Sequence, residues 1–256
     1  EKTTMARKYV IGGNWKSNGT QASVASLVEM LNGVTVDTDS VEVIIAPPAI
    51  YLSTVQASLK QHIRVSAQNV SLTGPGAYTG EIAAEQLKDL GLQWTLTGHS
   101  ERRALFGETD TIVAQKTKRA LDQGLDVIVC VGETLEERKA DQTLNVITRQ
   151  LKAVADLLAG DLGLWSRIVV AYEPVWAIGT GVVATPEQAQ DAHKNLRAWV
   201  ASHINPDVAL NLRIIYGGSV NAKNSSELIA LHDVDGFLVG GASLKPEFVE
   251  IIQSAQ

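Results

Sequence analysis

Short runs of apolar, often β-branched residues recur at wide intervals along this chain. Several of them are apolar at consecutive positions, which is typical of strands whose two faces are both covered. We therefore predict eight buried strands, at Tyr9–Ile11, Val41–Ile45, Ile63–Val65, Trp94–Leu96, Val127–Val131, Ile168–Val170, Ile214–Tyr216 and Phe237–Val239.

The segments between these strands carry apolar residues at helical spacing, and two of them begin with capping signals. Thr134 lies three residues before Glu137, and Thr185 lies three residues before Gln188, so both pairs predict helix starts. The apolar faces of two helices are predicted at Leu144, Ile147, Leu151, Val154 and Leu158, and at Ala189, Ala192, Leu196 and Trp199.

Strand and helix patterns alternate eight times in 256 residues, and no linker-like segment divides the chain. This alternation predicts an α/β protein with a single (β/α)8 barrel over residues 1–256, in which helices ring eight parallel strands. A doubly wound sheet is the alternative, because strand order cannot be taken from the sequence. Polar residues that directly follow the strands favour the barrel, since barrel chemistry lies at those strand ends.

The composition limits the partners and the compartment. A formal net charge of −6 argues against a nucleic acid or a membrane surface as partner. Cys130 is the single cysteine, which fits a reducing compartment, and the start of the chain has no secretion signal. We therefore expect a cytoplasmic protein. We also expect Met5 to be the natural start and residues 1–4 to be a cloning remnant.

Glu173 is the first candidate for chemistry. It stands where the strand that begins at Ile168 should end, and Pro174, which lacks an N–H, stops that strand. Apolar residues and a Gly179-Thr180-Gly181 hinge follow. A carboxylate at the root of a hinged apolar loop suits a base under a closing lid. An ordinary loop with an exposed glutamate is the alternative.

Two glycine pairs follow the seventh and eighth predicted strands. They are Gly217-Gly218, before Ser219, and Gly240-Gly241. Glycine lets the backbone approach a ligand closely, and phosphate sites of barrels form in these two loops. The pairs therefore predict a phosphate site, with two ordinary turns as the alternative.

Polar residues also follow three other strands. His99 comes after the fourth, where a neutral imidazole can donate a hydrogen bond. Asn14 and Lys16 come after the first, where the lysine is a candidate anion clamp. Cys130 ends the fifth, and we interpret it as a packing residue. No cluster of His, Cys and carboxylates has metal-ligand spacing, so no metal is implied.

Five segments in this order closely resemble the triosephosphate isomerase family: Asn14–Lys16, Gly98–Arg103, Ala171–Gly181, Tyr216–Ser219 and Leu238–Gly241. The resemblance extends from about residue 8 to residue 253. It implies interconversion of D-glyceraldehyde 3-phosphate and dihydroxyacetone phosphate through an enediolate, in glycolysis and gluconeogenesis, without cofactor or metal.

The resemblance also implies the catalytic roles. Glu173 is the expected base and His99 the neutral imidazole that polarises the substrate oxygens, a pairing for which this family is the standard example. Lys16 and Asn14 are expected to bind the substrate and stabilise negative charge on oxygen. Glu101 is expected to support the polar network around Lys16 and His99.

Phosphate binding and the lid follow from the same resemblance. Ile178 and Leu238 are expected to form an apolar clamp that raises the basicity of Glu173. The expected phosphate-binding residues are Gly179, Ser219, Gly240 and Gly241, and the expected lid is Pro174, Val175, Trp176, Ala177, Ile178, Gly179 and Thr180.

A homodimer is the last implication. The segment Thr73–Glu81 is expected to dock beside the partner's active site, with Tyr78, Thr79 and Ser17 in the interface. Three residues depart from the family pattern: Ser17, where Met or Cys is common; Val182, where Lys is common; and Thr97, where an aliphatic residue is usual.

The residues alone leave two other functions open. A Schiff-base aldolase on the same barrel needs a lysine at the end of the sixth strand, where this chain has Glu173. A non-catalytic sugar-phosphate-binding barrel has no need for Glu173, His99 and Lys16 together.

Overall fold

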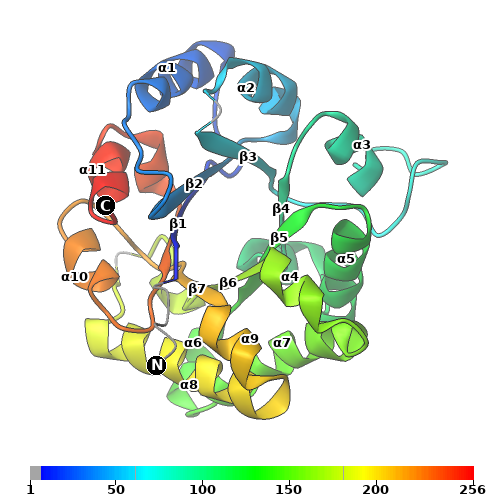
Figure 1. The fold of residues 1–256 in the computed structure, drawn as a ribbon, viewed down its shortest axis with the longest axis vertical. Coiled ribbons are helices and arrows are strands. Elements are labelled where there is room, and N and C mark those ends of the chain that lie inside the picture. Colours follow the sequence, from blue (N-terminus) through cyan, green and yellow to red (C-terminus); the bar gives the residue numbers. More distant parts are fainter. Residues whose placement is uncertain (1–6, 61, 181) are drawn as a thin grey trace.

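Eight parallel strands close into a barrel in the computed structural model, which describes residues 7–60, 62–180 and 182–256 (Figure 1). Each strand pairs with the next along the chain, and β8 pairs with β1, so the doubly wound alternative is wrong. All eight predicted strands are confirmed: β1 Tyr9–Asn14, β2 Val41–Ala46, β3 Ile63–Ala67, β4 Trp94–Thr97, β5 Asp126–Val131, β6 Ile168–Tyr172, β7 Arg213–Tyr216 and β8 Gly236–Val239.

Helices surround this barrel (Figure 1). The α-helices are α1 Gln21–Asn32, α2 Leu52–Ser58, α3 Ala84–Asp89, α4 Ser100–Phe106, α5 Asp110–Asp122, α6 Leu135–Lys139, α7 Thr143–Leu158, α8 Pro186–His203, α9 Pro206–Asn211, α10 Ser225–Ile229 and α11 Glu247–Gln253. Short 3-10 helices are η1 Ala49–Tyr51, η2 Leu162–Arg167, η3 Val175–Ala177 and η4 Gly241–Leu244. Within the described ranges, no helix combines the length and apolar character needed to cross a membrane.

The strands bury side chains on both faces. Val10, Ile128 and Val169 belong to a cluster that fills the interior of the barrel. Ile45 and Val129 belong to the larger cluster between the strands and the helices. This double burial explains why the strand sequences are apolar at consecutive positions.

The buried face of α7 differs from the sequence prediction at one position. Ile147, Leu151 and Val154 are fully buried, but Leu144 is 41% exposed, so the prediction for Leu144 is wrong. Leu144 lies in the first turn of α7, where most residues face solvent. Gln150, which the apolar pattern passed over, is buried on this face.

Both predicted capping boxes are present. The Thr134 hydroxyl accepts the N–H of Glu137 at the start of α6. The Thr185 hydroxyl accepts the N–H of Gln188 at the start of α8. The second cap fixes the end of the connection that carries the predicted lid. The expectations for residues 1–4, Met5 and Gly181 fall outside the described residues.

The departure at Thr97 is compensated inside the protein. Its hydroxyl lies 2.8 Å from the hydroxyl of Thr117 in α5, and Thr117 donates in turn to the carbonyl of Val113. Thr97 is therefore the donor to Thr117. The buried hydroxyl has a partner and ties β4 to the helix layer.

His193 is a buried histidine that the fold keeps neutral. It lies on α8 with its Nδ1 atom 3.1 Å from the carbonyl of Asp233, and Tyr172 packs edge-on against its ring. Burial lowers the pKa of His193 to about 4, although Asp233 and Asp235 oppose the shift. An unfolded histidine titrates near 6.5, so between these pH values the unfolded chain binds more protons.

We therefore expect the free energy of unfolding to fall as the pH falls from about 6.5 to about 4, with His193 contributing about 3 kcal/mol of that loss. Urea unfolding at several pH values tests this. His193→Gln removes the titrating group, so its curve should be flatter in this window. His203→Gln, at an exposed histidine of the same helix, is the matched control and should keep the original slope. Equal slopes in the two variants would contradict the assignment.

Candidate active site

The candidate active site lies at the C-terminal ends of the strands. Asn14 is the last residue of β1, His99 lies two residues beyond β4, and Glu173 directly follows β6. Closure of the barrel brings these three residues, far apart in the sequence, to the wall of one cavity of about 350 Å³. Lys16 lines the same cavity. Glu101, in the first turn of α4, contacts both Lys16 and His99.

Glu173 is held at a buried position by two donors. Its Oε1 atom lies 3.0 Å from Nε2 of His99, and its Oε2 atom accepts the backbone N–H of Ser100 at 2.9 Å. Nδ1 of His99 accepts the N–H of Glu101 at 3.2 Å. A neutral ring therefore carries its proton on Nε2 and donates it to Glu173. The two side chains form a pair that can exchange a proton.

The surroundings shift the pKa values of both groups. Burial raises the pKa of Glu173, but His99, the Ser100 N–H and the charge of Lys16 outweigh it and leave the pKa below its usual value. Burial lowers the pKa of His99, while Glu173 and Glu101 outweigh it and leave the pKa above its usual value. Glu173 is therefore ionised at neutral pH and able to accept a proton.

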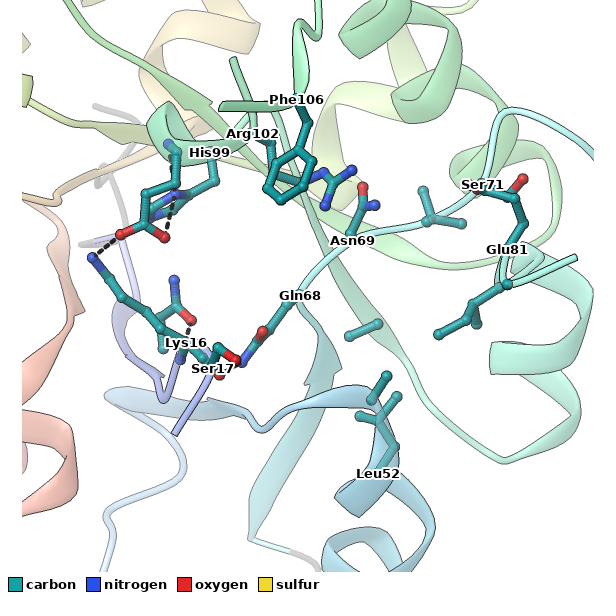
Figure 2. Close-up of a pocket in the computed structure, with 17 residues that line it drawn as sticks. Lys16, Ser17, Leu52, Gln68, Asn69, Ser71, Glu81, His99, Arg102 and Phe106 are labelled. Atoms are coloured by element: carbon teal, nitrogen blue, oxygen red, sulfur yellow. Dashed lines mark hydrogen bonds and ion pairs between the residues drawn. The ribbon is translucent and has the colours of Figure 1, made fainter. Parts of the chain in front are cut away.

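Lys16 has an unusual backbone conformation. Its φ of 53° lies in the left-handed region, which residues other than glycine seldom adopt. Asn14 Oδ1 accepts its N–H at 2.9 Å, and the Gln68 amide donates to its carbonyl at 2.7 Å. Its Nζ atom pairs with Glu101 at 2.6 Å, as the dashed line at Lys16 in Figure 2 shows. The lysine is thus held rigidly at the barrel mouth. The sequence pattern did not single out Gln68.

The predicted phosphate-binding residues line the same cavity as Glu173. Gly179, Ser219, Gly240 and Gly241 all border it. Gly179 has a φ of 65°, which strains any other residue. A Cβ atom at Gly240 would lie 3.6 Å from Cε of Lys16, so the lysine side chain passes directly over this glycine. The cavity therefore combines close backbone approach with a positive charge.

The predicted lid segment contains η3 and is tied to the barrel by several hydrogen bonds. The Trp176 indole donates to Glu133 at 3.0 Å, and the Ser219 hydroxyl donates to the Ala177 carbonyl at 2.7 Å. Glu133 is fully buried and also accepts the Tyr172 hydroxyl at 3.0 Å. Our sequence analysis missed Glu133, although a polar residue so soon after a strand was the signal used for the other strands.

The two residues of the predicted clamp border the cavity beside Glu173. Leu238 is buried in the barrel interior, and Ile178 of the lid is partly exposed. Val182, the departure after the lid, is 52% exposed. Nothing in the structure explains the departure at Val182.

A second cavity of about 420 Å³ adjoins the first (Figure 2). Asn14, Lys16 and His99 line both cavities, and Ser17 and Phe106 line the second. Tyr78 and Thr79 border neither cavity, although Gly80 and Glu81, which follow them on the segment that protrudes between β3 and α3 (Figure 1), line the second. Within one chain, the structure thus brings Ser17 to the site but keeps Tyr78 and Thr79 away from it.

Cys130 lies in the barrel interior behind Glu173. The side chain is fully buried. Burial raises the pKa of its thiol well above the usual value, and the charge of Glu173 raises it further. The thiol therefore stays protonated, which agrees with a packing role and not with a nucleophile.

The fold and this site define a class of protein. A barrel that presents an ionised carboxylate, an imidazole and a fixed lysine around a glycine-lined cavity is an enzyme for a small anionic substrate. Glu173 and His99 offer proton transfer, and no lysine stands at the end of β6 for Schiff-base chemistry.

Comparison with known proteins identifies the family. The family model described as triosephosphate isomerase matches residues 9–255. Triosephosphate isomerase of Debaryomyces hansenii is 58% identical over 251 residues, which cover 98% of this chain and 99% of that protein. Cytosolic triosephosphate isomerase of Oryza sativa subsp. japonica is 52% identical over 252 residues, 98% of each chain. Chloroplastic triosephosphate isomerase of Secale cereale is 53% identical over 248 residues, 96% of this chain and 82% of that protein.

The chain belongs to the triosephosphate isomerase family. The prediction of an isomerase that interconverts triose phosphates is confirmed by this membership, and the aldolase and non-catalytic alternatives are set aside.

Proposed function

We propose that Glu173 is the base that moves a proton between adjacent carbons of the triose phosphate. The observation that carries this proposal is its buried carboxylate, 3.0 Å from Nε2 of His99, at the wall of the glycine-lined cavity. A general base must reach the proton that it takes. Glu247 also borders the cavity but is only partly buried, so Glu173 is the better-shielded carboxylate there.

His99 stabilises the oxygens on which charge develops. Glu173 takes the proton from the carbon next to the carbonyl group, and the electron pair of that bond forms the enediolate. The Nε2–H of His99, which points to Glu173 in the structure, then donates to the substrate oxygens. Return of the proton to the neighbouring carbon, together with transfer of the hydroxyl proton to the former carbonyl oxygen, completes the isomerisation. No atom or electron is lost, so the step needs no oxidant or reductant.

Lys16 and Asn14 also bind the substrate from the wall of this cavity. The Lys16 ammonium supplies a fixed positive charge beside the developing oxyanion, where a preorganised charge is worth more than in water. Glu101 orients this ammonium through their 2.6 Å ion pair. Because Lys16 also passes over Gly240, one side chain contacts both the reacting end and the phosphate end.

The backbone N–H groups of Gly179, Ser219, Gly240 and Gly241 hold the phosphate. Closure of the lid over residues 174–180 moves Gly179 against the phosphate and excludes water from the enediolate. Ile178 and Leu238 then enclose Glu173. Their apolar surface raises the basicity of the carboxylate once substrate is bound, because desolvation disfavours its ionised form.

A coupled assay tests the activity. D-glyceraldehyde 3-phosphate is supplied, and a glycerophosphate dehydrogenase with NADH reports the dihydroxyacetone phosphate formed. We expect NADH oxidation that depends on the protein, and no added mass after treatment with borohydride and a ketose phosphate. A borohydride-trapped adduct would contradict the enediolate mechanism and indicate a Schiff base.

We also propose that the protein is a homodimer. The protruding segment 73–81 carries the half-exposed Tyr78, and the cavity of about 420 Å³ is open to receive such a segment from a second copy. Phe106 and Ile50, 65% and 80% exposed, provide further apolar surface near this cavity. In the dimer, Thr79 of one copy reaches toward Asn14 of the other.

Charges introduced into the protruding segment should break this dimer. We expect the variant Tyr78→Asp/Thr79→Asp to sediment as a monomer in analytical ultracentrifugation, with turnover at least about tenfold lower because Asn14 and Lys16 lose their support. Leu162→Asp, at another exposed apolar residue, is the control and should stay dimeric. A dimeric double variant would contradict the proposed interface.

We place the protein in the cytoplasm. The rice relative carries a cytosolic name, whereas the rye relative carries a chloroplastic one. Cell fractionation tests the assignment, and activity that sediments with organelles would contradict it.

A further inference from the structure

A glutamine on the buried face of α7 holds the backbone next to Glu173. Gln150 is 6% exposed, between Ile147 and Leu151 on an otherwise apolar face. Gly132, directly after β5, donates its N–H to Oε1 of Gln150 at 2.8 Å. The amide nitrogen of Gln150 donates back to the Gly132 carbonyl at 3.1 Å. The side-chain amide therefore pairs with Gly132 as a neighbouring strand would.

Gly132 in turn lies against the backbone of Glu173. A Cβ atom on Gly132 would stand 1.7 Å from the carbonyl oxygen of Glu173 and 3.2 Å from its Cβ atom. This approach leaves room for glycine alone. Because glycine is also the most flexible residue, its position depends on the groups that hold it.

Hydrogen bonds on both sides of Gly132 connect the same two segments. The N–H of Glu173 donates to the Val131 carbonyl at 2.7 Å, and the N–H of Val175 donates to the Glu133 carbonyl at 3.1 Å. Residues 131–133 thus support residues 173–175. Gln150, on α7, holds Gly132, the middle residue of this segment, through its two hydrogen bonds.

We propose that Gln150 is a positioning residue for the proton-transfer step, which it serves by fixing Gly132 and, through it, the backbone of Glu173. This inference rests on the proposed role of Glu173 as the base. A catalytic group that is displaced by about 1 Å can lose about 10²-fold in rate, so a contact this close to the base can govern turnover. The phosphate end of the cavity is lined by the loops after β7 and β8 and by the lid, and in the described residues Gln150 makes no hydrogen bond to any of them.

The first test is Gln150→Met, which keeps the length of the side chain but removes both hydrogen bonds. We expect kcat to fall about tenfold or more, while the affinity for inorganic phosphate, measured as competitive inhibition, stays within about twofold. Val154→Ala is the matched control, because Val154 is buried one turn further along the same face. It should lower the thermal midpoint but leave kcat unchanged.

The second test is Gln150→Glu, whose effect depends on protonation. A protonated glutamate can accept from the Gly132 N–H and donate to its carbonyl, as glutamine does. An ionised glutamate keeps the first bond but repels the carbonyl. The ratio of its kcat to that of the unsubstituted protein should therefore rise as the pH is lowered. The same ratio for Gln150→Met should not change with pH.

Parental kcat in Gln150→Met overturns the inference. So does a loss of kcat that Val154→Ala matches at equal destabilisation, or a Gln150→Glu ratio that does not change with pH, because each reveals a merely structural residue. Glu173→Gln is assayed in parallel. If that variant keeps full turnover, the proposed base is wrong. If it is inactive while Gln150→Met is fully active, only the role of Gln150 fails.

Discussion

Glu173→Gln should lower kcat by about 10³-fold, within the range of about 10²–10⁴ that a positioned general base contributes. The amide keeps the size of the side chain and one of its two acceptor oxygens but cannot take a proton. The phosphate end of the site contains no part of Glu173, so the affinity for a phosphate ligand should stay within about tenfold, or about 1.4 kcal/mol. Steady-state kinetics and inhibition by inorganic phosphate measure the two quantities.

The control for this variant is Glu187→Gln. Glu187 is exposed in the first turn of α8, and its replacement should leave kcat unchanged. Equal losses of turnover and phosphate affinity in Glu173→Gln would contradict its assignment as the base. Such a result would indicate a distorted site, because the carboxylate makes contacts with both His99 and Ser100.

Lys16→Ala should weaken both binding and turnover. A charged hydrogen bond contributes about 1.5–3 kcal/mol, so substrate affinity should fall about ten- to 10²-fold. Turnover should fall by a further factor of about 10², because the ammonium also stabilises the enediolate oxygen. The variant also leaves Glu101, which lies beside His99, without its ion-pair partner. The carboxylate of Glu101 then repels negative charge in the site. Initial rates over a range of substrate concentrations separate the two effects.

Two further variants refine the test of Lys16. Lys118→Ala removes a partly exposed lysine that pairs with Asp122 on the outside of the barrel, and it should change neither quantity. Lys16→Arg keeps the charge but not the shape, so it should restore affinity better than turnover. Unchanged substrate affinity in Lys16→Ala would contradict the clamp role.

The sequence predicted the strands well because their signal is local. Apolar runs such as Val127–Val131 are buried on both faces, so they are apolar at every position and do not alternate with polar residues. The positions of Asn14, His99 and Glu173 followed from the same pattern, because closure of a barrel places all strand ends on one face. The structure puts these residues around one cavity.

Residues that act through long-range contacts could not be predicted in this way. Gln150 is a polar residue on an apolar helix face, and no pattern near it in the sequence indicates that Gly132 is its hydrogen-bond partner. Gln68 likewise reaches Lys16 across the barrel mouth. The prediction that Leu144 is buried was wrong for a different reason. Helical periodicity assigns a face to a helix but does not state where along the helix burial begins. Such features depend on the packing of elements, which the sequence pattern does not contain.

Proton exchange with solvent tests the central claim most directly. Dihydroxyacetone phosphate is incubated with the protein in deuterium oxide, and deuterium on carbon is followed by NMR together with the formation of D-glyceraldehyde 3-phosphate. If Glu173 moves the proton, the unsubstituted protein should incorporate deuterium, and Glu173→Gln should lose exchange and isomerisation to the same extent. Exchange at the original rate in Glu173→Gln would show that another group removes the proton and would contradict the account.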